Sequence, residues 1–418
     1  MLRALSLVIL LLPALAGAKE VAVPGEAGAL LVAMENVQAG DVLRLDKDTI
    51  YKGSIVISVP LTIEGNGATI DGLGQGSTIT VTADDVTLRD LTVIGSGSGG
   101  EGLDAGITLS KTADNALVEN NRVLLNLVGI DVHGSTNSLI KDNYIEGRQD
   151  RRMNDRGNGI YVWNAPGTRI EGNDIRYGRD GVFVNTSRNN EFVNNRFRDL
   201  RFAVHYMYAN DSLVRGNIST RNHLGYAIMY SDRVRIEGNL SVNDRDHGIM
   251  MNYTNKGTVV DNTIRQVGDK CVFIYNSHRN TFRGNVFEGC RIGIHFTAGS
   301  EGNEIYENAF IGNRKQVKYV GSKWVEWSRD GTGNYWSDQA AFDLDGNGIA
   351  DSAYRPNDIM DQVLWSQPAA KSLLGSPAVQ LIRWSQSTFP AMLPGGVIDS
   401  APLMKPRLPE IPVWEKDK

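Results

Sequence analysis

Residues 169–176 read RIEGNDIR, residues 191–198 read EFVNNRFR, residues 213–220 read LVRGNIST and residues 235–242 read RIEGNLSV. In each segment an apolar residue stands three positions before an asparagine. In most repeats a second apolar residue stands two positions after it, and two repeats carry serine there, at Ser219 and Ser241. The asparagine recurs at positions 121, 143, 173, 195, 217, 239, 262, 285 and 308. The spacing is 22 or 23 residues, apart from one of 30, which indicates structural units that bury their apolar faces by stacking.

The apolar runs within each repeat are short, alternate in polarity and are rich in β-branched and aromatic residues. Helical repeats have longer periods and a 3.6-residue rhythm, and leucine-rich repeats have a leucine ladder. The sequence shows neither pattern. It predicts an all-β chain, a right-handed parallel β-helix with coils of 22–23 residues and three short strands per coil. Asparagine suits one corner of each coil because it tolerates left-handed backbone angles and bonds to the asparagines stacked above and below.

Four regions follow along the chain. Residues 1–18 predict a cleaved secretory signal, with Arg3, an apolar run too short to span a bilayer and a final Ala-Gly-Ala, and so predict a periplasmic protein. Residues 19–320 predict the β-helix, with an amphipathic helix over residues 26–37 as the cap of its open end. Residues 321–365 predict an irregular region that contains the calcium-type loop described below. Residues 366–418 predict a proline-rich tail.

The tail contains a predicted helix from Ser376 to Gln386, with serine as the cap and Pro377 at the first helical position. Its apolar residues Leu381, Ile382 and Trp384 predict that it either folds over the last coil or docks on a partner. The arginine-rich insertion at residues 148–156 is typical of a solvated loop, with a partner contact as the alternative.

Composition excludes several classes of protein. The charged fraction is 22%, the hydrophobic fraction is 41% and the net charge is −5, which fits a globular protein and no nucleic-acid partner. Two cysteines are too few for a disulfide scaffold. Cys271 and Cys290 fall on adjacent coils, where they predict either a disulfide or two buried thiols.

The second apolar run of each repeat predicts which side chains point outward. Its first and third residues are apolar in nearly every coil and face the core, so that the second and fourth face solvent. The first outward column reads Asp131, Tyr161, Phe183, His205, Ala227, Met250, Phe273 and His295. The second reads His133, Trp163, Asn185, Met207, Met229, Asn252, Tyr275 and Thr297. An exposed strip of this composition predicts a docking face, formed by Tyr161, Trp163, Phe183, Phe273, Tyr275 and His295.

Four of these outward residues predict a copper site. His205, Met207, Met229 and Met250 lie within roughly 10 Å of one another if rungs and strand neighbours have ordinary spacings. Thioethers and imidazole are the soft ligands that suit Cu(I). His223 and His247 fall just ahead of the same strand and are further candidates. The alternative is a docking or glycan-binding face without metal.

A second metal pattern lies near the C-terminus. Asp343, Asp345, Asn347 and Asp351 follow the D-x-D-x-N-G form of a calcium loop, with oxygens at alternate positions. Tyr354 stands where the EF-hand form has glutamate. The alternative is a series of Asx turns without calcium.

The outward columns argue against a carbohydrate-active enzyme. Glycosidases need carboxylates that face each other across the scissile bond. The columns hold only Asp131, and Asp180, Asp246 and Asp269 are expected at strand edges without a close pair on neighbouring rungs. The sequence therefore predicts a protein that is not an enzyme, with an extracytoplasmic carbohydrate-binding or carbohydrate-active β-helix protein as the alternative.

Four features together resemble the NosD family, the periplasmic β-helix proteins of nitrous oxide reductase maturation. They are the signal sequence, the coils, the segment NYWSD at residues 334–338 and the loop at residues 343–351. The resemblance implies a non-enzymatic role beside an ABC transporter (its membrane subunit and its ATPase), a copper-chaperone lipoprotein and the nitrous oxide reductase apoprotein, in assembly of the copper–sulfide centre. It also implies copper transit or chaperone docking at the Met/His cluster, and contact of the tail with the membrane subunit.

Overall fold

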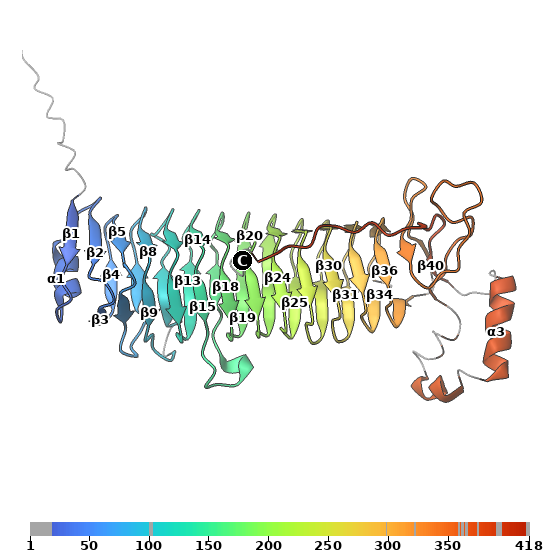
Figure 1. Cartoon of the computed structure of the whole chain (residues 1–418), viewed down its shortest axis with the longest axis horizontal. Coiled ribbons are helices and arrows are strands. Elements are labelled where there is room, and N and C mark those ends of the chain that lie inside the picture. Colours follow the sequence, from blue (N-terminus) through green and yellow to red (C-terminus); the bar gives the residue numbers. More distant parts are fainter. Residues whose placement is uncertain are drawn as a thin grey trace, which may run out of the picture.

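The structure is a computed structural model, and it describes residues 19–99, 103–297, 299–321, 323–357, 360, 363, 367–373, 376–389 and 395–414. Most of these residues form one elongated solenoid of short strands stacked along its long axis (Figure 1). The strands of its three long sheets pair in parallel. The prediction of an all-β parallel β-solenoid is confirmed. The signal sequence predicted for residues 1–18 lies outside the described residues.

Each coil contributes strands to three sheets, here named A, B and C. Sheet A has 13 strands: β1 (Glu20–Val23), β2 (Val42–Leu45), β5 (Thr62–Glu64), β8 (Thr87–Arg89), β11 (Leu117–Glu119), β14 (Leu139–Lys141), β17 (Arg169–Glu171), β20 (Glu191–Val193), β23 (Leu213–Arg215), β26 (Arg235–Glu237), β29 (Thr258–Val260), β32 (Thr281–Arg283) and β35 (Glu304–Tyr306). Sheet B also has 13: β3 (Ile50–Lys52), β6 (Thr69–Asp71), β9 (Thr92–Ile94), β12 (Arg122–Leu124), β15 (Tyr144–Glu146), β18 (Asp174–Arg176), β21 (Arg196–Arg198), β24 (Ile218–Thr220), β27 (Leu240–Val242), β30 (Thr263–Arg265), β33 (Val286–Glu288), β36 (Ala309–Ile311) and β39 (Tyr335–Trp336).

Sheet C has 12 strands, which are longer than those of sheets A and B from β10 onward: β4 (Ile55–Ile57), β7 (Ile79–Val81), β10 (Ala105–Leu109), β13 (Val128–His133), β16 (Ile160–Trp163), β19 (Asp180–Arg188), β22 (Phe202–Asn210), β25 (Leu224–Met229), β28 (His247–Asn252), β31 (Lys270–Tyr275), β34 (Ile292–Thr297) and β37 (Lys315–Val320). Strands of three residues in sheets A and B bury their middle side chain, such as Ile170 of β17, and leave the flanking polar residues at the surface. Sheet C therefore offers the longest outward-facing strip of the solenoid.

A ladder of buried asparagines holds the corner between sheets A and B. Asn195 donates through Nδ2 to the Asn217 Oδ1 at 3.0 Å and to the Ile170 carbonyl at 2.9 Å, and its backbone N–H donates to the same Asn217 oxygen at 2.9 Å. The arrangement repeats from Asn121 onward and reaches Asn334, beyond the last repeat seen in the sequence. Because the corner excludes water, the amides satisfy backbone groups that would otherwise lack partners.

The residue before each ladder asparagine from Asn121 to Asn308 has a left-handed backbone, with φ of 54° at Asn194 and 64° at Gly216. This conformation favours asparagine, aspartate and glycine, which explains the Gly-Asn, Asn-Asn and Asp-Asn pairs of the repeat. At Gly216 a Cβ would also stand 2.3 Å from the Asn194 Oδ1. The repeat signature thus follows from the turn geometry.

The two ends of the solenoid differ. Helix α1 (Ala29–Asn36) buries Leu30 and contacts β1 and β4 at the N-terminal end, inside the range predicted for a helix. At the other end β38 (Trp324–Glu326) pairs with β40 (Gly396–Ile398). Helix α3 (Pro377–Thr388) is capped by Ser376, whose side chain accepts a hydrogen bond from the Val379 N–H.

Two 3-10 helices lie at Met153–Asp155 (η1) and Pro368–Leu373 (η2). Among the described residues, no helix is both long and apolar enough to cross a membrane.

The tail closes the ladder and then returns along the coils. Asp399, fully buried, accepts from the Asn334 N–H at 2.7 Å and from the Trp336 indole at 2.8 Å, so that the NYWSD segment is the last rung. The chain after Asp399 runs back along the solenoid as far as its middle (Figure 1). Arg407 pairs there with Asp261 and Glu307. The C-terminal stretch up to residue 414 therefore folds back onto the coils.

Asp244 provides a test of the core. It is fully buried and accepts hydrogen bonds from Ser219 and Ser241, both at 2.6 Å, which explains the two serines that interrupt the repeat. Burial raises the pKa of Asp244 to about 6, although the serines and the Asn222 N–H oppose the rise. The pKa of the Asp244 carboxyl is therefore higher in the folded protein than in the unfolded chain. Its contribution to stability is greatest at a pH below its pKa in the unfolded chain, and it is lost as the pH rises through its pKa in the folded protein.

Asparagine has no carboxyl group to titrate. We therefore expect the free energy of unfolding of Asp244→Asn, relative to that of the wild type, to rise by about 2 kcal/mol between pH 4.5 and pH 7. The neutral amide keeps an acceptor for the Asn222 N–H, as asparagines do at this corner in other coils. Urea denaturation of both proteins across this pH range measures the difference. A difference that does not change with pH would contradict the assignment.

Candidate functional site

The outward columns of sheet C are in the predicted register. Phe183 pairs with His205, His205 with Ala227 and Ala227 with Met250. In the second column Asn185 pairs with Met207, Met207 with Met229 and Met229 with Asn252. The same register continues to Asp131 and His133 at one end and to Phe273, Tyr275 and His295 at the other. The aromatic residues predicted as a docking face thus lie on one face of consecutive coils.

The prediction that both columns face solvent is wrong for three residues of the first column, whose other members are half-buried. His205 is only 7% exposed, Asp131 4% and Ala227 0%. Neighbouring rings cover this column, because His205 stacks on Phe183 at 4.6 Å between ring centroids and meets the edge of Phe202 at 5.1 Å. In the second column Met207 and Met229 stay half-buried. A covered histidine beside partly accessible thioethers is a different environment from a solvated strip.

Asp180 fixes the orientation of His205. The side chain of Asp180, fully buried at the start of β19, accepts from the His205 Nδ1 at 3.1 Å and from Arg201 at 2.7 and 2.6 Å. Although burial alone would raise the pKa of Asp180, the hydrogen bonds from His205 and Arg201 lower it below its usual range. The carboxylate is therefore charged, and it places the His205 proton on Nδ1.

The other imidazole nitrogen of His205 is left with its lone pair. Its Nε2 is buried and has no hydrogen-bond partner within the described part of the chain. Buried polar atoms are almost always paired, and a histidine that donates from one nitrogen to a carboxylate while the other nitrogen is free has the arrangement of a metal-binding histidine. Met207 is two residues along the same strand, and Met229 is the next rung of its column. Regular sheet spacings place these three residues roughly 5 to 8 Å apart, on one face of two neighbouring strands.

Met250 takes a neighbouring place. It is paired with Ala227 and Phe273 in the first column, one rung beyond Met229, and it is half-buried. Regular sheet spacings put it roughly 8 Å from Met229, so it is more distant than Met207.

His223 and His247, predicted as further ligands of the same ion, lie elsewhere. His247 pairs with Leu224 and Lys270 in register, which places it roughly 14 Å from His205 by regular sheet spacings. Its Nδ1 stands 3.0 Å from the Asp246 Oδ1, and the His223 Nε2 stands 3.8 Å from the Asp246 Oδ2. Both histidines belong to a second group.

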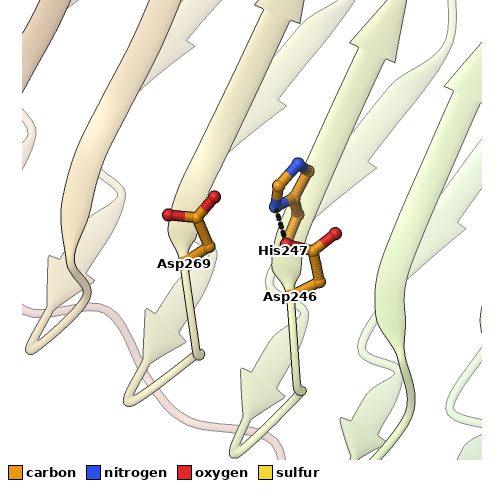
Figure 2. Close-up of side chains that lie close together, drawn as sticks. All are labelled: Asp246, His247 and Asp269. Carbon is orange, nitrogen blue, oxygen red and sulfur yellow. Dashed lines mark ion pairs between the residues drawn. The ribbon is translucent and has the colours of Figure 1, made fainter.

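That group also corrects the prediction that these carboxylates form no close pair on neighbouring rungs. Asp246, His247 and Asp269 each offer a ligand atom, and these atoms all lie within 4.8 Å of one another. Figure 2 shows Asp246 and His247 at the start of one strand and Asp269 at the matching place on the next coil. Lys270 and Arg291 pair with Asp269 and lower its pKa, against the effect of burial.

Comparison with known proteins decides the family. The chain is 40% identical over 370 residues to the probable ABC transporter binding protein NosD of Stutzerimonas stutzeri, with 85% of each chain covered. The NosD of Pseudomonas aeruginosa is 41% identical over 369 residues, covering 85% of this chain and 86% of the relative. The chain belongs to the NosD family. The family model, described as a periplasmic copper-binding protein, matches residues 142–341, which include His205, Met207 and Met229.

Similarity to solved structures supports the fold of this NosD-family chain, but at such low sequence identity it carries no information about activity. The A-module of the mannuronan C-5 epimerase AlgE6 of Azotobacter vinelandii superposes with a TM-score of 0.59 at 13% identity, over 70% of this chain and 90% of that chain. A mannuronic acid-specific polysaccharide lyase of family 6 from human gut microbiota gives a TM-score of 0.51 at 13% identity, over 72% and 82%. The NosD relatives themselves are named as binding proteins and not as enzymes.

The sequence analysis did not identify a ladder of exposed tyrosines that lies beside Met207 and Met229. Tyr208 stacks on Tyr230 at 5.2 Å and Tyr230 on Tyr253 at 5.0 Å between ring centroids. All three have left-handed backbones, with φ of 55°, 50° and 51°, a conformation that is rare for bulky residues. The signal was the tyrosine that follows Met207, Met229 and Asn252 in successive repeats. The ring faces turn toward one another, which leaves few open faces for stacking on a sugar.

The calcium interpretation is not supported. In the loop, Asp343 accepts from the N–H groups of Gly346, Asn347 and Gly348, Asp345 accepts from Asn347, and Asp351 accepts from Leu344. The bonds to Asp343 and Asp345 are those of Asx-type turns, the alternative that the sequence left open, and the bond to Asp351 closes the loop.

Cys271 and Cys290 form a disulfide, with their Cα atoms 5.8 Å apart. Both are buried, in agreement with the first of the two alternatives that the sequence left open.

Proposed function

We propose that this NosD-family chain is a non-enzymatic factor that receives and passes on Cu(I) outside the cytoplasm, together with an ABC transporter, in maturation of nitrous oxide reductase. The family description as a periplasmic copper-binding protein and the relatives' name as ABC transporter binding proteins support this proposal. The copper chaperone, the reductase apoprotein and the transporter subunits are partners within it.

The observation that carries the copper assignment is the environment of His205. A buried imidazole nitrogen without a hydrogen-bond partner in the described part of the chain costs free energy unless a ligand uses it. Met207 and Met229 add soft sulfur donors at half-buried positions, open enough for an ion to enter and leave. An imidazole and two thioethers suit Cu(I) better than Cu(II) or Zn(II). Copper is the cargo of this site.

The remaining surfaces have supporting roles in the proposal. The docking face along sheet C lies on coils to either side of the copper site, on β16 and β19 and on β31 and β34, where a protein that delivers or accepts the ion would contact it. Helix α3 exposes Leu381 and Trp384, at 63% and 61%, and is proposed as a contact for the membrane subunit. The Arg148–Arg156 insertion, which contains η1, is a further candidate for a partner contact.

Anaerobic titration of the tag-free mature chain with Cu(I), against a chromophoric chelator, tests the proposal. We expect one Cu(I) per chain, and we expect Met207→Leu/Met229→Leu to bind at least about 100-fold more weakly, the upper end of what loss of an outer-sphere partner costs a metal site. Leucine keeps the volume of the side chain, so the fold is retained.

Met34→Leu, in α1 at the far end of the solenoid, is the matched control and should bind as the wild type does. Equal affinity of the double variant and the wild type would show that copper does not use this column.

A further inference from the structure

The group formed by Asp246, His247 and Asp269 is separate from the second outward column, which carries Met207 and Met229. Its ligand atoms come from two successive coils and lie within 4.8 Å of one another. The carboxylate of Asp246 and the imidazole of His247 stand side by side (Figure 2). No step of the proposed Cu(I) transfer uses these residues.

His247 is buried and one of its ring nitrogens lacks a well-formed hydrogen bond. Its side chain is only 9% exposed, and its Nδ1 makes no hydrogen bond of good geometry to any described residue although the Asp246 Oδ1 is 3.0 Å away. The edge of Phe273 packs on the ring at 5.6 Å and limits its movement.

The donor set selects a different ion from the one held by thioethers. One imidazole nitrogen and two carboxylates are ligands for divalent first-row ions such as Zn(II) and Cu(II), whereas Cu(I) prefers sulfur. A second imidazole, His223, is half-exposed at the rim with its Nε2 3.8 Å from Asp246. The group thus has three ligands on adjacent coils and a fourth donor at its entrance.

Two basic side chains hold Asp269 in the absence of an ion. The Lys270 Nζ is 2.5 Å from the Asp269 Oδ2, and Arg291 pairs with the other oxygen. Lys270 is mostly buried, at 14% side-chain exposure, while Arg291 is 56% exposed and free to turn into solvent. The ammonium of Lys270 therefore competes with a bound cation for the same carboxylate.

We propose that Asp246, His247 and Asp269 bind one divalent transition-metal ion, Zn(II) or Cu(II), at a site independent of the Cu(I) site, and that Lys270 occupies the carboxylate of Asp269 when the ion is absent. The site goes beyond the proposed function and does not depend on it. A chain with both sites holds Cu(I) and a divalent ion at different places on the same sheet.

Calorimetric titration of the tag-free chain with Zn(II), and separately with Cu(II) followed by electron paramagnetic resonance, tests the site. We expect one ion per chain. His247→Gln or Asp269→Asn should weaken binding at least tenfold, and Lys270→Met should strengthen it several-fold. Circular dichroism reports whether each variant is folded, and Asp246→Asn provides a second variant if His247→Gln is not.

The controls separate this site from the Cu(I) site. Met207→Leu/Met229→Leu should bind Zn(II) as the wild type does, and so should His278→Gln, which removes an imidazole outside the cluster. Mg(II) should not compete. The proposal is overturned if the wild type shows no saturable one-to-one binding, if His247→Gln binds equally well, if the methionine variant loses Zn(II), or if Lys270→Met binds more weakly.

Discussion

Asn217→Ala is expected to lower the free energy of unfolding by about 4 kcal/mol, since it orphans several buried groups at once. The Asn217 Oδ1 accepts from the Asn195 N–H and Nδ2, and its own Nδ2 donates to the Phe192 carbonyl at 2.8 Å and to the Asn239 Oδ1 at 3.0 Å. Alanine leaves these partners in a corner with no exposure to water. Urea denaturation followed by far-ultraviolet circular dichroism measures the loss.

Asn194→Gly is the matched control, because Asn194 is the turn residue directly before the ladder residue Asn195. Asn194 is exposed and has a left-handed backbone, which glycine adopts readily, so its replacement should change the free energy of unfolding by less than about 1 kcal/mol. Equal effects of the two substitutions would contradict the claim that the ladder amides, rather than the turns, hold the coils together.

Asp180→Asn is expected to weaken Cu(I) binding about 10- to 100-fold, as loss of a carboxylate behind a metal-binding histidine does in other sites. The amide no longer holds the proton of His205 on Nδ1, so the nitrogen offered to copper is no longer fixed. We also expect a loss of stability on the order of 2 kcal/mol, because Arg201 loses its counter-ion but keeps 24% exposure of its side chain. Titration against a Cu(I) chelator and urea denaturation measure the two effects.

Asp211→Asn breaks a surface pair with Arg233 and serves as the control for loss of an Asp–Arg pair. It should leave Cu(I) affinity unchanged and cost less than about 1 kcal/mol. If Asp180→Asn lowered stability but left Cu(I) affinity unchanged, Asp180 would be a structural residue and would not position His205 for copper.

Regular repeats made most of the fold accessible from the sequence. A period of 22 or 23 residues fixes which side chains share a column, so the register from Asp131 to His295 was predictable one residue at a time. The extension of the ladder was not, because Asn334 follows Asn308 by 26 residues and its partner Asp399 comes from the tail. The sequence left open whether the tail folds over the last coil or docks on a partner, and it gave no sign that Asp399 and Val397 belong to the core.

The candidate site was predicted in part. Alternation placed His205 and Met207 on the outward face, but it says nothing of what covers them. The rings of Phe183 and Phe202 cover His205, and Asp180 on the preceding coil fixes its orientation. Alternation also could not separate His247 from the methionines, because that required the ion pairs with Asp246 and the register with Lys270.

X-ray absorption at the copper edge of the Cu(I)-loaded mature chain tests the central claim most directly. We predict a mixed shell of nitrogen and sulfur ligands, in which the sulfur contribution is lost in Met207→Leu/Met229→Leu and the imidazole contribution is lost in His205→Ala. A shell of nitrogen and oxygen alone, or a spectrum that neither variant changes, would contradict the assignment of copper to His205, Met207 and Met229.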